Sequence, residues 1–179
     1  VVSAMGKTTN ALEKITKEYM AKEGQLKKSI QELKDYHNEI LADLFPDQGH
    51  KIYNEVNNVL VELEWIIEDE PVDDYDFEYD QIVSLGEMIS TRIVSAWLTA
   101  SGIENTWVDV RDLIKTDNTY REAVVEWEPT ESAIKKKLSP MMKGEGSSVV
   151  VTQGFVGVTS ENYNTTLGRE GSDYTASIL

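Results

Sequence analysis

Apolar residues recur at helical spacing through the N-terminal part of the chain. A short apolar strand, Val1–Ser3, precedes a helix that Thr9 or Asn10 would cap. The next periodic segment, Gln25–Leu44, ends where the proline and glycine of FPDQG break a helix. Another periodic segment follows directly, so residues 25–68 are predicted to form a helical hairpin.

Helical and strand patterns alternate in the rest of the chain. A long helix is expected to end at Gly102, and its apolar face would consist of Ile82, Leu85, Ile89, Ile93 and Trp97. A short strand in NTWVDVRDLI, a helix around Thr130–Leu138 and a turn at Gly144–Ser148 come next. The unbroken apolar run Val149–Val151 is typical of a strand buried on both faces of a parallel sheet.

The C-terminal segment completes this pattern. VTSENYNTTLG is typical of a β-hairpin, and Ser172 or Asp173 would cap a last helix. The alternation of strands and helices therefore predicts an α/β fold with a mainly parallel sheet.

Composition and charge narrow the class of protein. The chain has 179 residues, 40% of them hydrophobic, which suits one buried domain. Its formal net charge of -15 argues against binding to nucleic acid or an anionic membrane, and favours a small-molecule or protein partner. The sequence has no cysteine for a disulfide or a zinc site and no apolar run long enough for a membrane span. We therefore expect a cytoplasmic protein.

The two ends of the sequence predict a fragment. VVSAM, which starts without an initiator Met, is typical of the end of a buried strand, and TASIL is typical of an unfinished helix. We therefore expect the function to belong to a longer parent protein.

Acidic residues dominate the segment EDEPVDDYDFEYD, residues 68–80. A calcium loop would need a glycine at its turn, and this segment has none. We interpret it as a solvated acidic linker and place no site there.

Residues that could bind a ligand lie in loops that follow predicted strands or precede a predicted helix. These loops are Ser3–Asn10, Gln153–Gly157 and Gly168–Asp173. Ligands of open α/β sheets lie outside the carboxyl ends of the strands, so the loops are expected to form one pocket. Arg169 lies between glycines, where a planar cation suits a carboxylate or phosphate. The alternative is a helix cap with a solvated arginine.

Other polar and aromatic residues carry weaker signals. Gly86 within a helix indicates close approach of another group, and the alternative is a packing glycine beside a surface glutamate, Glu87. His37 and His50 are interpreted as surface residues. The tryptophans are interpreted as core or interface residues, because no basic groove accompanies them: Trp65, Trp97, Trp107 and Trp127.

Taken in order, VVSAMGKTTNAL, SLGEMIST, DVRDLIKTD, VTQGFVG and TTLGREGSDYTA resemble the aspartate kinase family. The resemblance covers the chain except the helical hairpin and the acidic linker. It implies the amino acid kinase fold, a three-layer α/β/α sandwich with a mainly parallel central sheet. It also implies transfer of the ATP γ-phosphoryl group to the side-chain carboxylate of L-aspartate, with Mg²⁺, as the first step toward lysine, threonine and methionine.

The resemblance also implies roles for residues at matching positions. Arg169 would hold the α-carboxylate of aspartate and Glu87 its α-ammonium group. The other substrate-binding positions would be Ser3, Thr9, Phe155 and Ser172. Asp173 would be catalytic, organising cationic groups around the transferred phosphoryl.

Two features depart from the family pattern. Glu170 stands where the family often has glycine, and we expect its side chain to point to solvent. The family's KFGG-type strand, its nucleotide contacts and its regulatory domains have no counterpart in these residues. We therefore expect residues 1–179 to be a partial catalytic domain that is inactive alone.

Other functions remain open. A kinase for another amino acid, such as glutamate or acetylglutamate, would share the fold. A non-catalytic acidic module that binds a partner through the helical hairpin is a further alternative. The sequence leaves open the effector, fusion to homoserine dehydrogenase and the oligomeric state, although a homo-oligomer is possible in the full-length protein.

Overall fold

The computed structural model describes residues 1–22, 24–142 and 149–179. Its helices are α1 Thr8–Met20, α2 Leu26–Leu44, α3 Lys51–Glu68, α4 Tyr75–Val83, α5 Leu85–Ala100, α6 Trp127–Met142 and α7 Gly171–Ile178. Its strands are β1 Asn105–Val108, β2 Val149–Thr152, β3 Val156–Val158 and β4 Asn164–Thr166, and a 3₁₀ turn spans Val110–Asp112. The turn predicted at Gly144–Ser148 lies outside the described residues.

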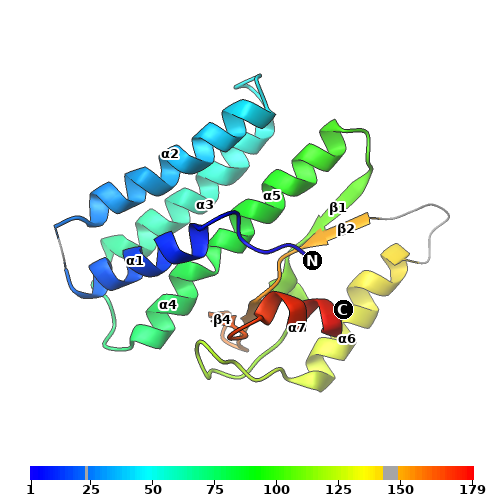
Figure 1. Cartoon of the computed structure of the whole chain (residues 1–179). Helices are drawn as coiled ribbons and strands as arrows, with labels where there is room; N and C mark the ends of the chain where they lie inside the picture. The colour runs from blue at the N-terminus through cyan, green and yellow to red at the C-terminus, as the bar shows by residue number, and fades with distance from the viewer. Residues whose placement is uncertain (23, 143–148) are drawn as a thin grey trace.

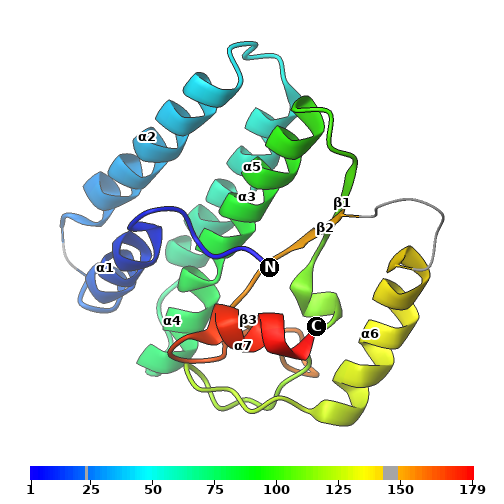
Figure 2. The same cartoon turned by 45° about the vertical axis from the view of Figure 1, so that its right-hand side comes forward.

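Helices lie on both sides of the strands (Figure 1). Helices α1 to α5 form one layer, and α6 and α7 lie on the other side of β1 and β2 (Figure 2). Neighbouring residues of β1 face opposite ways, as a pleated strand requires. Trp107 packs against the core of α1 to α5, whereas Val108 belongs to the core beneath α6. The predicted α/β fold is confirmed.

Strand pairing is parallel where the sequence predicted it. Strand β1 pairs in parallel with β2, and Val2 forms a parallel bridge with Gln153. Strands β3 and β4 form the predicted antiparallel hairpin. The predicted strand Val1–Ser3 is reduced to this one bridge at Val2.

The predicted hairpin, α2 and α3, is part of the helical layer. Leu33 of α2 and Leu60 of α3 are buried in the same core as Leu12 of α1 and Ile89 of α5. The amphipathic stripes of these helices thus share one apolar interior.

Several predicted helix boundaries were wrong. Helix α1 begins at Thr8 after Lys7, so neither Thr9 nor Asn10 caps it. The long helix is divided at Ser84 into α4 and α5, and Trp97 on its expected buried face is 44% exposed. Helix α7 begins after Glu170, which adopts a left-handed backbone, so Ser172 and Asp173 lie inside its first turn. These boundaries depend on tertiary contacts and backbone angles that a local pattern does not encode.

The interpretation of residues 68–80 as a solvated linker holds only for their first part. Asp74 caps α4 by accepting from Asp76 N and Phe77 N at 3.0 and 3.1 Å. Glu78 and Asp80 are buried. The acidic run thus continues into α4, where two of its carboxylates, Glu78 and Asp80, are buried.

The surface interpretation of His37 was also wrong. Its side chain is fully buried, Nδ1 donates to Leu33 O at 2.9 Å, and Nε2 accepts from the Thr8 hydroxyl at 3.2 Å. Burial lowers the pKa of His37 and favours this neutral form. His50 is partly exposed and caps α3.

The tryptophans divide into two groups. Trp107 is half-buried against the helical core, whereas three are exposed: Trp65, Trp97 and Trp127. None of the helices in the described ranges has the length and apolar character needed to cross a membrane.

Candidate ligand-binding cleft

The predicted loops meet at one edge of the strands. Val2 N donates to Thr152 O at 3.0 Å, and Gly154 N donates to Val2 O at 3.0 Å. The loop that begins at Ser3 therefore leaves the sheet beside the loop after β2. This is the carboxyl end of both parallel segments, where α/β proteins bind ligands.

Close backbone packing joins the loop after β2 to the start of α7. A Cβ on Gly154 would lie 2.7 Å from the Cα of Ser172, and one on Gly171 would lie 2.7 Å from Phe155 Cδ2. Phe155 N donates to Thr175 Oγ1 at 3.0 Å, and Leu167 N donates to Phe155 O at 2.8 Å. The glycines of VTQGFVG and GREGSD thus let the two loops touch.

A cleft of about 680 Å³ opens beside these loops. Three predicted site residues line it: Thr9, Phe155 and Arg169. Arg169 is exposed, and no carboxylate oxygen of the described residues lies within 4.0 Å of its guanidinium group. Glu170 is exposed, as expected. The arginine is therefore available to an anionic group in the cleft.

Sequence reasoning missed much of the cleft wall. The further lining residues are Asp76, Tyr79, Thr119, Tyr120, Arg121, Glu122, Thr166 and Gly168. Arg121 pairs with Asp76 at 3.2 Å, and its guanidinium carbon lies 4.5 Å from the centroid of the Tyr79 ring. Its φ of 66° is unusual for a residue with a side chain. No local pattern indicated this turn.

Asp80 holds two residues of the cleft wall, Arg121 and Thr166, in place by hydrogen bonds. Its Oδ2 accepts from Arg121 N and Thr166 N, both at 2.9 Å, and its Oδ1 accepts from the Thr166 hydroxyl at 2.6 Å. Burial raises the pKa of Asp80 to about 7, although these hydrogen bonds oppose the rise. Arg121 and Thr166 are thereby held on one carboxyl group.

Glu87 is a buried carboxyl group at the start of α5. Its Oε1 accepts from Ala4 N at 3.2 Å, whereas no group of the described residues donates to its buried Oε2. Burial raises the pKa of Glu87 to about 7. A Cβ on Gly86 would lie 3.2 Å from Ala4 Cβ, so this glycine lets the first loop approach the helix. Burial of Glu87 rules out the alternative of a surface glutamate beside a packing glycine.

The remaining predicted residues lie near these loops but do not line the cleft. Ser3 is exposed, and its carbonyl oxygen accepts from the Ser90 hydroxyl at 2.7 Å. Ser172 is half-buried beside Gly154, and Asp173 is exposed in the first turn of α7. Within the described ranges, no three His, Cys, Asp or Glu side chains gather as a metal site would require.

The fold is that of an α/β domain with a cleft at the carboxyl ends of its parallel strands. The chain belongs to the amino acid kinase family, whose family model matches residues 1–179. The likeness of the sequence motifs to this family is thereby confirmed.

Curated relatives carry aspartokinase names. Lysine-sensitive aspartokinase 3 of Escherichia coli (strain K12) is 35% identical over 101 residues, which are 56% of this chain and 22% of that protein. The chloroplastic bifunctional aspartokinase/homoserine dehydrogenase 1 of Arabidopsis thaliana is 25% identical over 185 residues, covering 100% of this chain and 20% of that protein. The chain thus spans about a fifth of the length of these relatives.

Two solved structures of an aspartokinase are also similar to this chain. E. coli aspartokinase III in complex with aspartate and ADP (R-state) superposes with a TM-score of 0.86 at 28% identity, covering 99% of this chain and 38% of that one. The complex of that enzyme with lysine and aspartate (T-state) gives a TM-score of 0.87, also at 28% identity and with the same coverage.

Proposed function

We propose that this chain is the substrate-binding part of an aspartate kinase. The reaction would transfer the γ-phosphoryl group of ATP to the side-chain carboxylate of L-aspartate. A carboxylate oxygen would bond to the γ-phosphorus, and the bond from that phosphorus to the bridging oxygen would break and release ADP. Relatives named aspartokinase and a structural neighbour in complex with aspartate and ADP support this proposal.

The observation that supports the proposal is that Arg169, in the loop before α7, and Glu87, in the first turn of α5, both lack a full set of partners among the described residues. Arg169 faces the cleft as a cation, and Glu87 offers a buried oxygen that lacks a donor. An amino acid presents the complementary groups, an α-carboxylate and an α-ammonium. In this assignment Arg169 holds the α-carboxylate and Glu87 the α-ammonium group.

The other assignments complete the proposed substrate site. Thr9 and Phe155 line the cleft and would contact the body of aspartate. Ser3 would add a contact at the first loop and Ser172 a hydrogen bond at the start of α7. Asp173 would organise the cationic groups around the transferred phosphoryl, since this chemistry depends on positioning and charge neutralisation.

ATP and Mg²⁺ belong to the proposal for the whole protein. Mg²⁺ is usually held by one or two carboxylates together with substrate phosphates, so it does not need a ready-made group of three acidic side chains. The cytoplasmic location and a homo-oligomeric parent stay predictions.

Calorimetric titration with L-aspartate tests the proposal, with circular dichroism to confirm folding. L-aspartate is expected to bind in preference to D-aspartate and L-glutamate, and Arg169→Ala is expected to weaken binding at least about tenfold by removing a charge-assisted contact. Lys136→Ala removes an exposed cation on α6 and serves as the matched control. Preference for L-glutamate would favour a different amino acid kinase. Unchanged binding in Arg169→Ala would contradict the assignment.

A further inference from the structure

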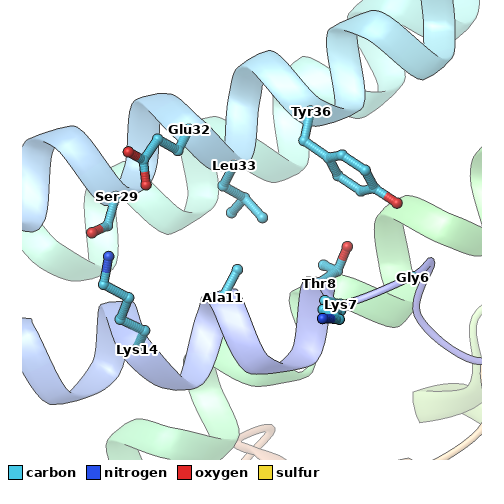
Figure 3. A pocket seen from close by; sticks show the side chains of 9 residues that line it. All are labelled: Gly6, Lys7, Thr8, Ala11, Lys14, Ser29, Glu32, Leu33 and Tyr36. Carbon is cyan, nitrogen blue, oxygen red and sulfur yellow. The ribbon is translucent and has the colours of Figure 1, made fainter.

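A second cavity lies between α1 and α2 (Figure 3). Its volume of about 360 Å³ falls in the range of about 300–1,000 Å³ that is typical of small-molecule sites. Residues of α1 and of the loop before it form one wall, and residues of α2 form the other. The cavity shares no lining residue with the cleft that contains Arg169.

The space exists because short side chains of α1 and α2 face each other across it. Thr8, Ala11 and Lys14 recur at helical spacing on α1, and Ser29 and Leu33 do so on α2. Ala11 and Ser29 stand where longer apolar residues would close the gap between two packed helices. Figure 3 shows their side chains ending short of the opposite helix.

Ser29 provides a second, independent sign of a ligand. The residue is 4% exposed, and its hydroxyl oxygen is buried without a hydrogen-bond partner among the residues that the structure describes. A buried hydroxyl without a partner costs free energy, so such groups are rare unless something binds them. Ser29 lines the cavity opposite Lys14, whose amine points toward it from α1 (Figure 3).

Charges of both signs accompany Ser29 at this end of the cavity. Lys14 and Glu32 line it from opposite helices, and each pairs within its own helix only at 3.6 Å, with Glu18 and Lys28. Beyond them the lining is apolar at Ala11 and Leu33. A cation, an anion and a hydroxyl thus adjoin an apolar space.

We propose that this cavity binds a small zwitterionic amino acid with an apolar side chain. Lys14 and the Ser29 hydroxyl receive its α-carboxylate, Glu32 receives its α-ammonium group, and its side chain lies between Ala11 and Leu33. A zwitterion has no net charge, so the field of a chain with a net charge of -15 does not repel it as it would repel a simple carboxylate.

The position of the cavity links it to the cleft. Thr8 lines the cavity, and the next residue, Thr9, lines the cleft. Thr8 also shares a hydrogen bond with the buried His37 of α2. A ligand that fixes the first turn of α1 therefore acts on both sites, and the coupling must be reciprocal. This effect on aspartate binding rests on the proposed function, whereas binding to the cavity does not.

Titration of the protein with L-leucine, followed by saturation-transfer NMR and calorimetry, tests the proposal. L-leucine is expected to bind, while L-leucinamide and 4-methylpentanoate, which each lack one of its two charges, bind at least about tenfold more weakly. Ala11→Leu fills the cavity and should abolish binding. Lys14→Met keeps the side-chain length, removes the cation and should weaken binding at least about tenfold.

Ala42→Leu, an equal enlargement on an exposed position of α2, is the control and should leave binding unchanged. Circular dichroism confirms that each variant folds. Absence of L-leucine binding to the folded protein would overturn the proposal, as would undiminished binding in a folded Ala11→Leu or Lys14→Met variant. Equal affinity for 4-methylpentanoate would overturn the zwitterion assignment. None of these readouts uses aspartate, so failure of the proposed kinase function would leave them interpretable.

Discussion

Asp80 and Glu87 are both buried carboxyl groups, but their hydrogen-bond partners differ. Burial raises the pKa of each to about 7. Three donors converge on Asp80, so its interactions are complete within the chain. Glu87 accepts from Ala4 N, and its Oε2 is buried without a hydrogen-bond partner in the described part of the chain. Asp80 thus holds the wall of the cleft, whereas the unpaired oxygen of Glu87 is the acceptor that we propose for the ammonium group of aspartate.

The free oxygen of Glu87 predicts pH-dependent binding of aspartate. An ammonium group attracts the ionised carboxylate, so a ligand must drive off the proton that Glu87 holds below its pKa of about 7. The affinity for L-aspartate should therefore fall up to about tenfold per pH unit below this pKa. Calorimetry in buffers of different ionisation enthalpy should record proton release. Glu87→Gln should bind weakly and lose this pH dependence, and a wild-type protein without it would contradict the assigned contact.

For Asp80 the pH dependence concerns stability. Its pKa is raised from 3.8 to about 7 in the folded protein, so its contribution is fully present below the unfolded pKa and is lost as pH rises through the folded value. Asp80→Asn can keep the hydrogen bonds, because the Thr166 hydroxyl can also accept. The free energy of unfolding of this variant should therefore rise relative to wild type between those pKa values, by about 1.4 kcal/mol per unit of pKa difference.

Urea unfolding at about pH 4 and about pH 8, either side of the transition, measures this difference. Asp80→Ala is the companion variant, since it removes all acceptors and should destabilise the protein at both pH values. A constant difference between Asp80→Asn and wild type would show that Asp80 does not carry the raised pKa.

The contact between the loop after β2 and the start of α7 requires a residue without a side chain at Gly154. A Cβ on Gly154 would lie 2.4 Å from the Ser172 hydroxyl oxygen and 2.7 Å from its Cα, which is backbone and cannot rotate away. Gly154→Ala should therefore destabilise the protein by about 1–3 kcal/mol and displace Phe155 from the cleft. Thermal unfolding and aspartate titration measure the two effects. Gly24→Ala is the control, because its added Cβ would have no atom of the described, non-neighbouring residues within 4 Å, and equal stability of the two variants would refute the clash.

Local periodicity predicted those helices and strands whose burial follows from neighbouring residues. The hairpin of α2 and α3 and the parallel strand β2 follow from apolar spacing and are confirmed. The break at Ser84 is different, because the Ser84 hydroxyl accepts from the Asn164 side chain, far along the chain. Helix α1 starts after Lys7 and α7 after Glu170, where the backbone angles of the preceding loops end the non-helical segment. Neither a long-range contact such as that of Ser84 nor such a backbone angle leaves an apolar pattern in the sequence.

The residues of the candidate site likewise divide into those that a local pattern predicted and those that it did not. Thr9, Phe155 and Arg169 stand out in glycine-rich or strand-following loops, and the structure brings them together. Arg121 was missed because its left-handed turn is held by Asp80, inside a segment whose charge suggested only a solvated linker. The composition of an acidic run does not reveal which carboxylate is buried.

Across the whole molecule, the cleft lies where two hydrophobic cores meet. Phe155 packs against both the core of α1 to α5 and the core beneath α6, and it also lines the cleft. Thr9 comes from the first core's side, on α1, and Arg169 from the loop before α7. A ligand that engages both residues therefore bridges the two cores.

Binding of L-aspartate should accordingly stabilise both cores together. At about 100 times its dissociation constant a ligand adds about 2.7 kcal/mol to the free energy of unfolding. Hydrogen–deuterium exchange should slow in α1 and α5, which belong to the first core, and also in β3 and α7, which pack in the second. Arg169→Ala should lose the protection in both parts at once, because each depends on the same bound ligand. Protection confined to α1 and α5 would show that the ligand does not reach the loop of Arg169, and the two charges would then belong to separate sites.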